Sequence, residues 1–106
     1  MAEKTATTTM NNGAAIVFNL IADSETSWVT SKRDKMIIFI SGDFGGTGTA
    51  TVEYNVKDLA ADVGFPDEAL EFDADGFCVI NCHSQLAVRV VLDGATSPDL
   101  DVVFLV

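Results

Sequence analysis

Hydrophobic and polar residues alternate along much of this chain with the two-residue period of a β-strand. From Thr49 to Val56 the apolar positions fall on one face and the polar positions on the other, as in a half-buried strand. Residues 86–93 alternate in the same way and place Arg89 on the outward side. Because the chain is acidic, we expect a cross-strand or inter-subunit carboxylate beside this arginine.

Other segments are apolar on both faces, which indicates strands that need cover on both sides. Residues 36–40 form an unbroken apolar run, and residues 14–22 are rich in β-branched and aromatic side chains, which favours strand over helix. Residues 100–106 predict a last strand of the same two-faced kind. A two-layer sandwich buries only one face of each strand, so we expect self-association to cover the second faces.

Glycine-containing segments separate these strands. The glycine-rich run at 42–49 predicts a turn that joins two strands into a β-hairpin spanning residues 35–56. An Asp-Gly pair at 75–76 predicts a second hairpin between strands at 70–73 and 76–83. The remaining segments are expected to form a polar turn at 23–26, a brief strand at 27–30, and a loop with one short turn at 57–70.

Seven or eight strands at intervals of about 8 to 15 residues, with no convincing long helix, predict an all-β fold. We expect an antiparallel β-sandwich or jelly roll, and the pattern leaves the choice of topology open. A chain of 106 residues has room for one domain. The expected organisation is a flexible N-terminal arm at 1–13 followed by the sandwich domain at 14–106.

Charge narrows the range of partners. Sixteen acidic and six basic residues give a net charge of −10, which repels nucleic-acid phosphates and anionic lipid, so neither nucleic acid nor membrane is an expected partner. The longest apolar run is far too short to span a bilayer, and the polar N-terminus has no signal-like core, so synthesis in a cytoplasm is expected.

The charges are also unevenly placed. Seven acidic residues lie within 58–75, whereas Lys32, Arg33 and Lys35 form the basic cluster. This segregation predicts attachment to a partner through complementary charge; the alternative is an acidic face that only keeps the protein soluble.

Candidate catalytic and cofactor sites fail on residue type or on spacing. The glycine-rich run lacks the Lys-Ser/Thr of a Walker loop. His83 is the lone histidine, and its neighbours Cys82 and Ser84 point to the opposite face of a strand. Residues 72–76 begin like a calcium loop, but Cys82 stands where the bidentate glutamate is needed. We predict no enzyme activity, no cofactor and no metal, with a weak surface cation site among the acidic residues of 67–75 left open.

The two cysteines, Cys78 and Cys82, are not expected to pair. On one strand their Cα atoms would lie about 13 Å apart, at about 3.3 Å per residue. A disulfide needs a separation below about 7 Å. We expect both thiols to be reduced and buried.

Four segments together resemble a group of small virion proteins of tailed bacteriophages. They are WVTSKR at 28–33, ISGDFGG at 40–46, TVEY at 51–54 and VRVVLDGATSPDLDV at 88–102. Proteins of this group resemble β-sandwiches that assemble on the capsid or at the head–tail region, often as trimers, and have no catalytic site to carry over.

The resemblance implies a non-enzymatic capsid cement or decoration protein that bridges and stabilises capsomers in the virion. Its implied partners are copies of itself, as a homotrimer, and the major capsid protein or neighbouring virion subunits. The alternatives are a head–tail completion protein and a jelly-roll module that binds carbohydrate or the host surface through exposed aromatic residues. Phe44, at the tip of the glycine-rich run, either folds back on the core or inserts into a partner. The residues expected at interfaces are Trp28, Lys32, Arg33, Lys35, Phe44 and Arg89.

Overall fold

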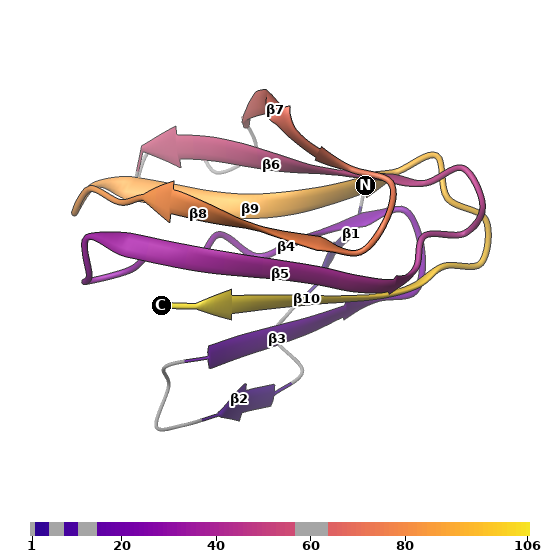
Figure 1. The fold of residues 1–106 in the computed structure, drawn as a ribbon, viewed down its shortest axis with the longest axis horizontal. Coiled ribbons are helices and arrows are strands. Elements are labelled where there is room, and N and C mark those ends of the chain that lie inside the picture. The colour runs from indigo at the N-terminus through magenta and orange to yellow at the C-terminus, as the bar shows by residue number, and fades with distance from the viewer. Residues whose placement is uncertain (1, 5–7, 11–14, 57–63) are drawn as a thin grey trace.

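The computed structural model describes residues 2–4, 8–10, 15–56 and 64–106, which form two β-sheets packed face to face (Figure 1). Sheet I has the strand order β1-β4-β9-β6-β7, and sheet II has the order β2-β3-β10-β5-β8. No helix in these residues is long and apolar enough to cross a membrane. The strands are β1 (Ala2–Lys4), β2 (Thr8–Met10), β3 (Ala15–Leu20), β4 (Ser24–Thr26), β5 (Lys35–Asp43), β6 (Thr49–Val56), β7 (Phe65–Phe72), β8 (Gly76–Asn81), β9 (Leu86–Asp93) and β10 (Asp99–Leu105).

Strands β3 to β10 form a nested antiparallel ribbon. In this ribbon β3 pairs with β10, β4 with β9, β5 with β8, and β6 with β7. The ribbon is rolled so that β10 also lies beside β5, and β9 beside β6. The resulting orders, β4-β9-β6-β7 and β3-β10-β5-β8, are those of a jelly roll. The predicted all-β sandwich is therefore confirmed, and its topology is the jelly roll.

Both predicted hairpins are wrong. β5 lies in sheet II and β6 in sheet I, and β7 and β8 are likewise in opposite sheets. A hairpin joins strands about 4.8 Å apart, whereas these connections cross between sheets about 10 Å apart. Glycines with positive φ, at Gly42, Gly45 and Gly46, allow the sharp change of direction that either kind of connection requires. Local turn chemistry therefore could not tell which strand the chain joins next.

Two local predictions are also corrected. The expected polar turn at 23–26 contains strand β4, whose buried Ser24 and Thr26 hydroxyls are satisfied: Ser24 Oγ donates to the Ala22 carbonyl, and Thr26 Oγ1 accepts from the Val90 amide. The brief strand expected at 27–30 is reduced to one bridge between Val29 and Val88.

The expected loop at 57–70 contains the first part of β7, and residues 57–63 lie outside the described residues. Proline has no backbone N–H to donate to a neighbouring strand. β7 tolerates Pro66 because it is the edge strand of sheet I and has no neighbouring strand on its outer side.

The N-terminal segment contributes strands to both sheets. β1 pairs with β4 in parallel, and β2 pairs with β3 in antiparallel register. Both lie within residues 1–13, where the sequence predicts an arm, and the flexibility of that arm stays a prediction. The strands predicted at 14–22, 86–93 and 100–106 correspond closely to β3, β9 and β10.

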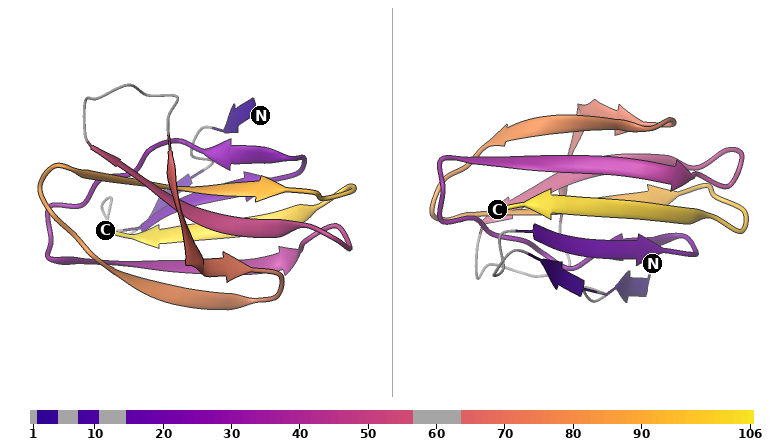
Figure 2. Two further views of the ribbon diagram at one scale, coloured as in Figure 1. Left: turned by 90° about the horizontal axis from the view of Figure 1, so that it is seen from above. Right: turned by 60° about the horizontal axis from the view of Figure 1, so that its bottom comes forward.

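Figure 2 shows the two sheets from two further directions, and the buried side chains of the core come from both of them. Leu100, Val102 and Phe104 of β10 are fully buried, and the Phe104 ring meets Phe18 of β3 edge to face with centroids 5.6 Å apart. Edge-to-face contact between aromatic rings adds stabilisation beyond the burial of their area. The inner face of β10 is therefore joined to its neighbour β3 by aromatic packing as well as by backbone pairing.

We expect Phe104→Ala to lower the free energy of unfolding by about 3 to 5 kcal/mol, because it leaves a cavity in the centre of the core. Urea unfolding measures the change. Phe65→Ala is the matched control, since Phe65 is 61% exposed on β7 and its removal leaves no cavity. Equal losses in the two variants would contradict this placement of the core.

Candidate interaction surface

The outer face of sheet II carries apolar side chains, of which Phe39, Phe77 and Val79 are exposed and the rest half-buried. Because side chains alternate along a strand, the residues between the buried core positions of sheet II must point away from the core. Phe39 is 41% exposed and Phe77 is 62% exposed, although both belong to strands of a folded domain. We call this surface the apolar face, and it consists of Val17, Ile37, Phe39, Phe77, Val79, Val103 and Leu105.

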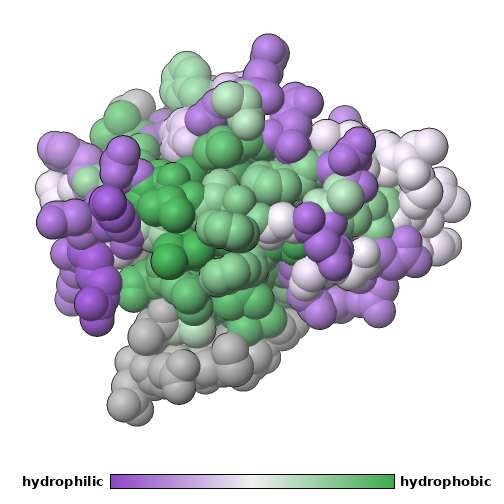
Figure 3. Space-filling model, viewed as in Figure 1, coloured by the Kyte–Doolittle hydropathy of each residue, from purple (hydrophilic) through white to green (hydrophobic). Residues whose placement is uncertain are grey.

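Strand register brings these side chains into two rows across the sheet. One row joins Val17, Val103, Phe39 and Phe77, which are successive partners on the four strands. The second row joins Leu105, Ile37 and Val79. The Phe39 and Phe77 rings lie with centroids 5.6 Å apart. Figure 3 shows the result as a continuous hydrophobic region at the centre of the molecule, with hydrophilic residues at either side.

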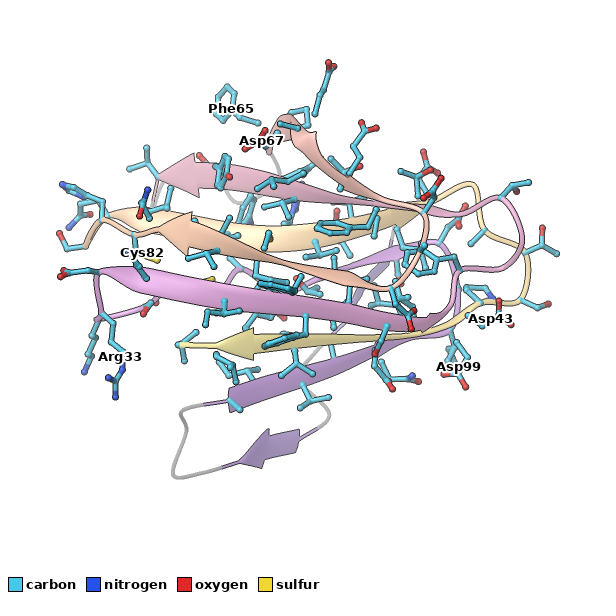
Figure 4. The ribbon with its side chains drawn as sticks, viewed as in Figure 1. Arg33, Asp43, Phe65, Asp67, Cys82 and Asp99 are labelled. Carbon is cyan, nitrogen blue, oxygen red and sulfur yellow. The ribbon has the colours of Figure 1, made fainter. Side chains whose placement is uncertain are left out.

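Opposite charges flank the apolar face at its two ends. Lys32, Arg33 and Lys35 are exposed in the connection before β5 and at its first residue. At the other end, Asp43 is the last residue of β5 and lies beside Asp99 of β10. β5 separates Lys35 from Asp43 by about 27 Å, at about 3.4 Å per residue. Figure 4 shows Arg33 at one end of the molecule and Asp43 and Asp99 at the other.

Arg89 lies on the opposite surface, the outer face of sheet I, and is only 6% exposed. Its Nε and Nη2 atoms both lie 2.9 Å from Glu53 Oε1, and Nη1 lies 3.4 Å from Glu25 Oε1. Glu53 is its direct partner on the neighbouring strand β6. The predicted carboxylate neighbour is therefore confirmed within the chain, and an inter-subunit role for Arg89 stays a prediction.

Trp28 helps to cover this ion pair. The guanidinium carbon of Arg89 lies 4.3 Å from the centroid of the Trp28 ring, within the range of a cation–π contact. A Cβ at Gly64 would collide with the Glu53 carboxylate, so the backbone just before β7 also approaches the ion pair closely. Trp28 is half-buried, and its ring stabilises the chain's own arginine.

Phe44 folds back on the core and is 8% exposed. The connection that carries it is locked to the connection between β9 and β10: Thr96 donates its amide to the Gly45 carbonyl, and Thr47 Oγ1 donates to the Gly94 carbonyl. A Cβ at Gly45 would stand 2.7 Å from the Thr96 backbone, so only glycine allows this approach. The glycine-rich run thus serves packing between two connections and does not present Phe44 to a partner.

Pockets lie at the basic end of the sandwich and beside β7 and β8. The first, of about 450 Å³, lies at the basic end and is lined by Thr30, Lys32, Arg33, Asp34, Cys82 and Gln85, among others. The second, of about 440 Å³, lies near β7 and β8, where the Tyr54 hydroxyl donates to Asp67 Oδ2 at 2.8 Å. Burial and then this hydrogen bond raise the pKa of Tyr54, which keeps the phenol protonated and unsuited to act as a base.

The other candidate catalytic and metal-binding side chains do not come together in one site. His83 lies in the turn after β8, where its Nδ1 accepts from the Gln85 amide at 3.0 Å. Asp75 accepts from the Gly42 amide, and Asp67 accepts from the Ala69 amide as well as from the Tyr54 hydroxyl, so both carboxylates already have hydrogen-bond partners within the chain. Across residues 15–56 and 64–106 no three His, Cys, Asp or Glu side chains gather in a group that could hold a metal ion.

Sequence reasoning found only part of this surface. It identified the two-faced apolar strands that supply Val17, Ile37 and Phe39, and it identified the basic cluster. It missed Phe77 and Val79, although they alternate with Cys78 and Ile80 in the apolar run of β8. It also missed the acidic end, because the residues that form it are brought together only by the pairing of β5 with β10.

Comparison with known proteins adds little. The chain matches no family model and no curated protein. One solved structure, "IMPa metallopeptidase in complex with T-antigen", is similar over 85% of this chain at 14% identity, with a TM-score of 0.48. The chain spans 12% of the length of that protein. A likeness this weak carries no argument about what the chain does.

We expect Arg89→Ala to lower the free energy of unfolding by about 2 to 4 kcal/mol, because it leaves Glu53 and Glu25 side by side with no positive charge. Arg89→Lys should lose less, since an ammonium keeps the charge but not the planar contact with Trp28. Urea unfolding compares them with Arg33→Ala, which removes an exposed arginine. Similar stability for Arg89→Ala and Arg33→Ala would show that the ion pair does not support the fold.

The cysteines should react slowly in the folded protein. Both are free; Cys78 is buried as predicted, whereas Cys82 is only half-buried because it lies just after the end of β8. Burial raises the pKa of the Cys78 thiol to about 11, with a smaller contribution from Asp67. Burial also raises the pKa of Cys82. Only the thiolate reacts, so iodoacetamide at pH 7 should label both thiols more slowly than in urea, and Cys78 more slowly than the less buried Cys82. Mass spectrometry of peptides locates the label; rapid labelling of Cys78 in the folded chain at pH 7 is the contrary outcome.

Proposed function

We propose that this chain is a non-enzymatic structural module that joins a larger assembly through the apolar face of sheet II. The observation that carries the proposal is the exposure of Phe39, Phe77 and Val79 on regular strands, in a surface that adjoins both charged ends. Apolar patches on monomeric proteins rarely exceed a few hundred Å², and larger ones mark interaction sites. An apolar region of two rows, one four strands wide and the other three, is close to this limit.

We further propose that the assembly is the virion of a tailed bacteriophage, where the chain acts as a capsid cement or decoration protein. The support for the virion is the sequence resemblance, and the support for an assembly is the apolar face. On this proposal the major capsid protein, a neighbouring virion subunit or another copy of the chain covers the face. A homotrimer and a place at the head–tail junction follow from the same resemblance and remain predictions.

The alternative of carbohydrate or host-surface binding has less support. It assigned sugar stacking to Trp28 and Phe44, and each of these rings already has a partner inside the chain. The exposed rings are instead Phe39, Phe77 and Phe65. Phe39 and Phe77 sit in an apolar row, whereas sugar sites combine an aromatic platform with convergent polar groups.

The test is made on particles from cells that carry the gene. We expect the chain in fixed stoichiometry with the major capsid protein by quantitative mass spectrometry. Particles that lack it should lose their genome at a lower temperature while adsorbing to cells normally. Phe77→Ser should be missing from purified particles, because it places a hydroxyl in the centre of the contact. Phe65→Ser is the matched control and should be present, since Phe65 is equally exposed but lies on sheet I.

Two results would count against the proposal. Stable particles that no longer adsorb would favour the host-surface alternative. Incorporation of Phe77→Ser at the wild-type level would show that the apolar face is not the attachment surface.

A further inference from the structure

We propose that a second copy of this chain covers the apolar face, stacked sheet II against sheet II with its strands running in the opposite direction. This inference rests on the proposed function, because it names the partner of the same face. Its basis is the order in which charge and apolar surface follow one another along the strands.

That order is basic, apolar, acidic. Along β5 the outward residues begin with Lys35, continue with Ile37 and Phe39, and reach Asp43 at the far end. β10 adds two exposed carboxylates at the acidic end, with Asp99 beside Asp43 and Asp101 beside Ser41. The carboxylates of Asp99 and Asp101 both accept from the Asn19 side chain, at 2.7 and 2.9 Å. This hydrogen bonding holds the acidic end in a fixed position.

Symmetry turns this order into a prediction of orientation. Two copies of one face meet about a two-fold axis that lies between the sheets and runs either along the strands or across them. An axis along the strands places basic end on basic end and acidic end on acidic end. An axis across the strands places each basic end on an acidic end. Juxtaposed like charges cost several kcal/mol, so the axis across the strands is favoured.

The strand register then says which residues meet. The two apolar rows are the Ile37 row and the Phe39 row, which are neighbours along β5. An axis between them sets the Ile37 row of one copy on the Phe39 row of the other. Lys35 lies one row beyond Ile37, and Asp101 lies one row beyond Val103 in the Phe39 row. In this arrangement Lys35 of each copy lies opposite the row of the second copy that contains Asp101.

The size of the contact limits its strength. From the Lys35 row to the row of Ser41 and Asp101 it spans four strands and about seven residues, or about 19 by 23 Å, so two copies together cover about 900 Å². Specific interfaces usually bury about 1,200 to 2,000 Å², and smaller ones are weak. We therefore expect a reversible dimer with a dissociation constant on the order of micromolar, and not a permanent one.

A two-fold pair differs from the trimer that the resemblance implies. A three-fold ring needs a head-to-tail contact in which one surface meets a different surface. The apolar face and the charges at its two ends are complementary to themselves in the order of charge. Among the described residues, this self-complementarity favours two copies over three.

Sedimentation equilibrium of the full chain, from about 1 to 200 µM, tests the association. We expect the mass to rise from that of one chain to that of two. Phe77→Ser should raise the dissociation constant at least about ten-fold, and the control Phe65→Ser should leave it unchanged. Far-UV circular dichroism and thermal melting confirm that both variants fold.

A charge exchange tests the orientation. Lys35→Glu and Asp101→Lys should each weaken the dimer about ten-fold or more, because the two-fold axis repeats every change at two places. The double variant Lys35→Glu/Asp101→Lys should recover most of the affinity, since each pair is attractive again with its signs reversed. Added salt should weaken the wild-type dimer.

Each contrary result has a distinct meaning. A single-chain mass at all concentrations overturns the second copy as partner; if Phe77→Ser is still lost from particles, the proposed function survives. A mass of three chains overturns the pair in favour of a trimer. If a dimer forms and its affinity is the same in Lys35→Glu, Asp101→Lys and the double variant, the antiparallel arrangement is overturned.

Discussion

Strand β10 carries the constraint on which the rest of the structure depends. Its inner residues Leu100, Val102 and Phe104 are fully buried between the sheets, and β3 and β5 are held on either side of it by backbone pairing. Once those three point inward, the two-residue period forces Asp101, Val103 and Leu105 outward. A register shift by one residue would expose the core and bury Asp101, so the outer face is fixed by the inner one.

Alternation directs every second residue of a strand to an outer face, and the two outer faces of the sandwich carry different kinds of residue. On sheet I, Arg89 and its two glutamates form an ion pair under Trp28, so charge and cover both come from the chain itself. On sheet II the outward residues at the centre are apolar and either exposed or half-buried, and the charged residues lie at the ends. A buried ion pair satisfied within one chain gives a partner little to bind, whereas an exposed apolar surface loses contact with water when a partner covers it. This difference is why we propose sheet II, and not sheet I, as the interaction surface.

The connections between strands contribute to rigidity. The glycine-rich segment after β5 interlocks with the segment after β9, and Asp23 accepts from the amides of Gly94 and Ala95. Three connections are thus tied together at the acidic end of the sandwich. A fixed end helps to hold Asp43 and Asp99 in place beside the apolar face, which suits recognition by a preformed surface.

Much of the strand content could be read from the sequence, because alternation is a local property. Residues 86–93 and the last strand were predicted almost to the residue, and the double-faced character of residues 36–40 already pointed to an exposed apolar surface. Short or polar strands escaped this reading. β4 has buried hydroxyls in place of apolar side chains, and its stability comes from hydrogen bonds to residues far along the chain.

By itself, the sequence determined the all-β class, the reduced cysteines, and which central residues of β5 and β9 share a face. Only the tertiary structure decided which strands are neighbours, because pairing joins residues that are distant in the chain. It placed β5 beside β10 and β8 and not beside β6, and so joined Phe39 to Phe77 and brought Asp43 to Asp99. It also turned Phe44 inward and gave Arg89 its partners. A glycine-rich turn has the same local chemistry whether it closes a hairpin or crosses between sheets, and only packing of the whole core selects between them.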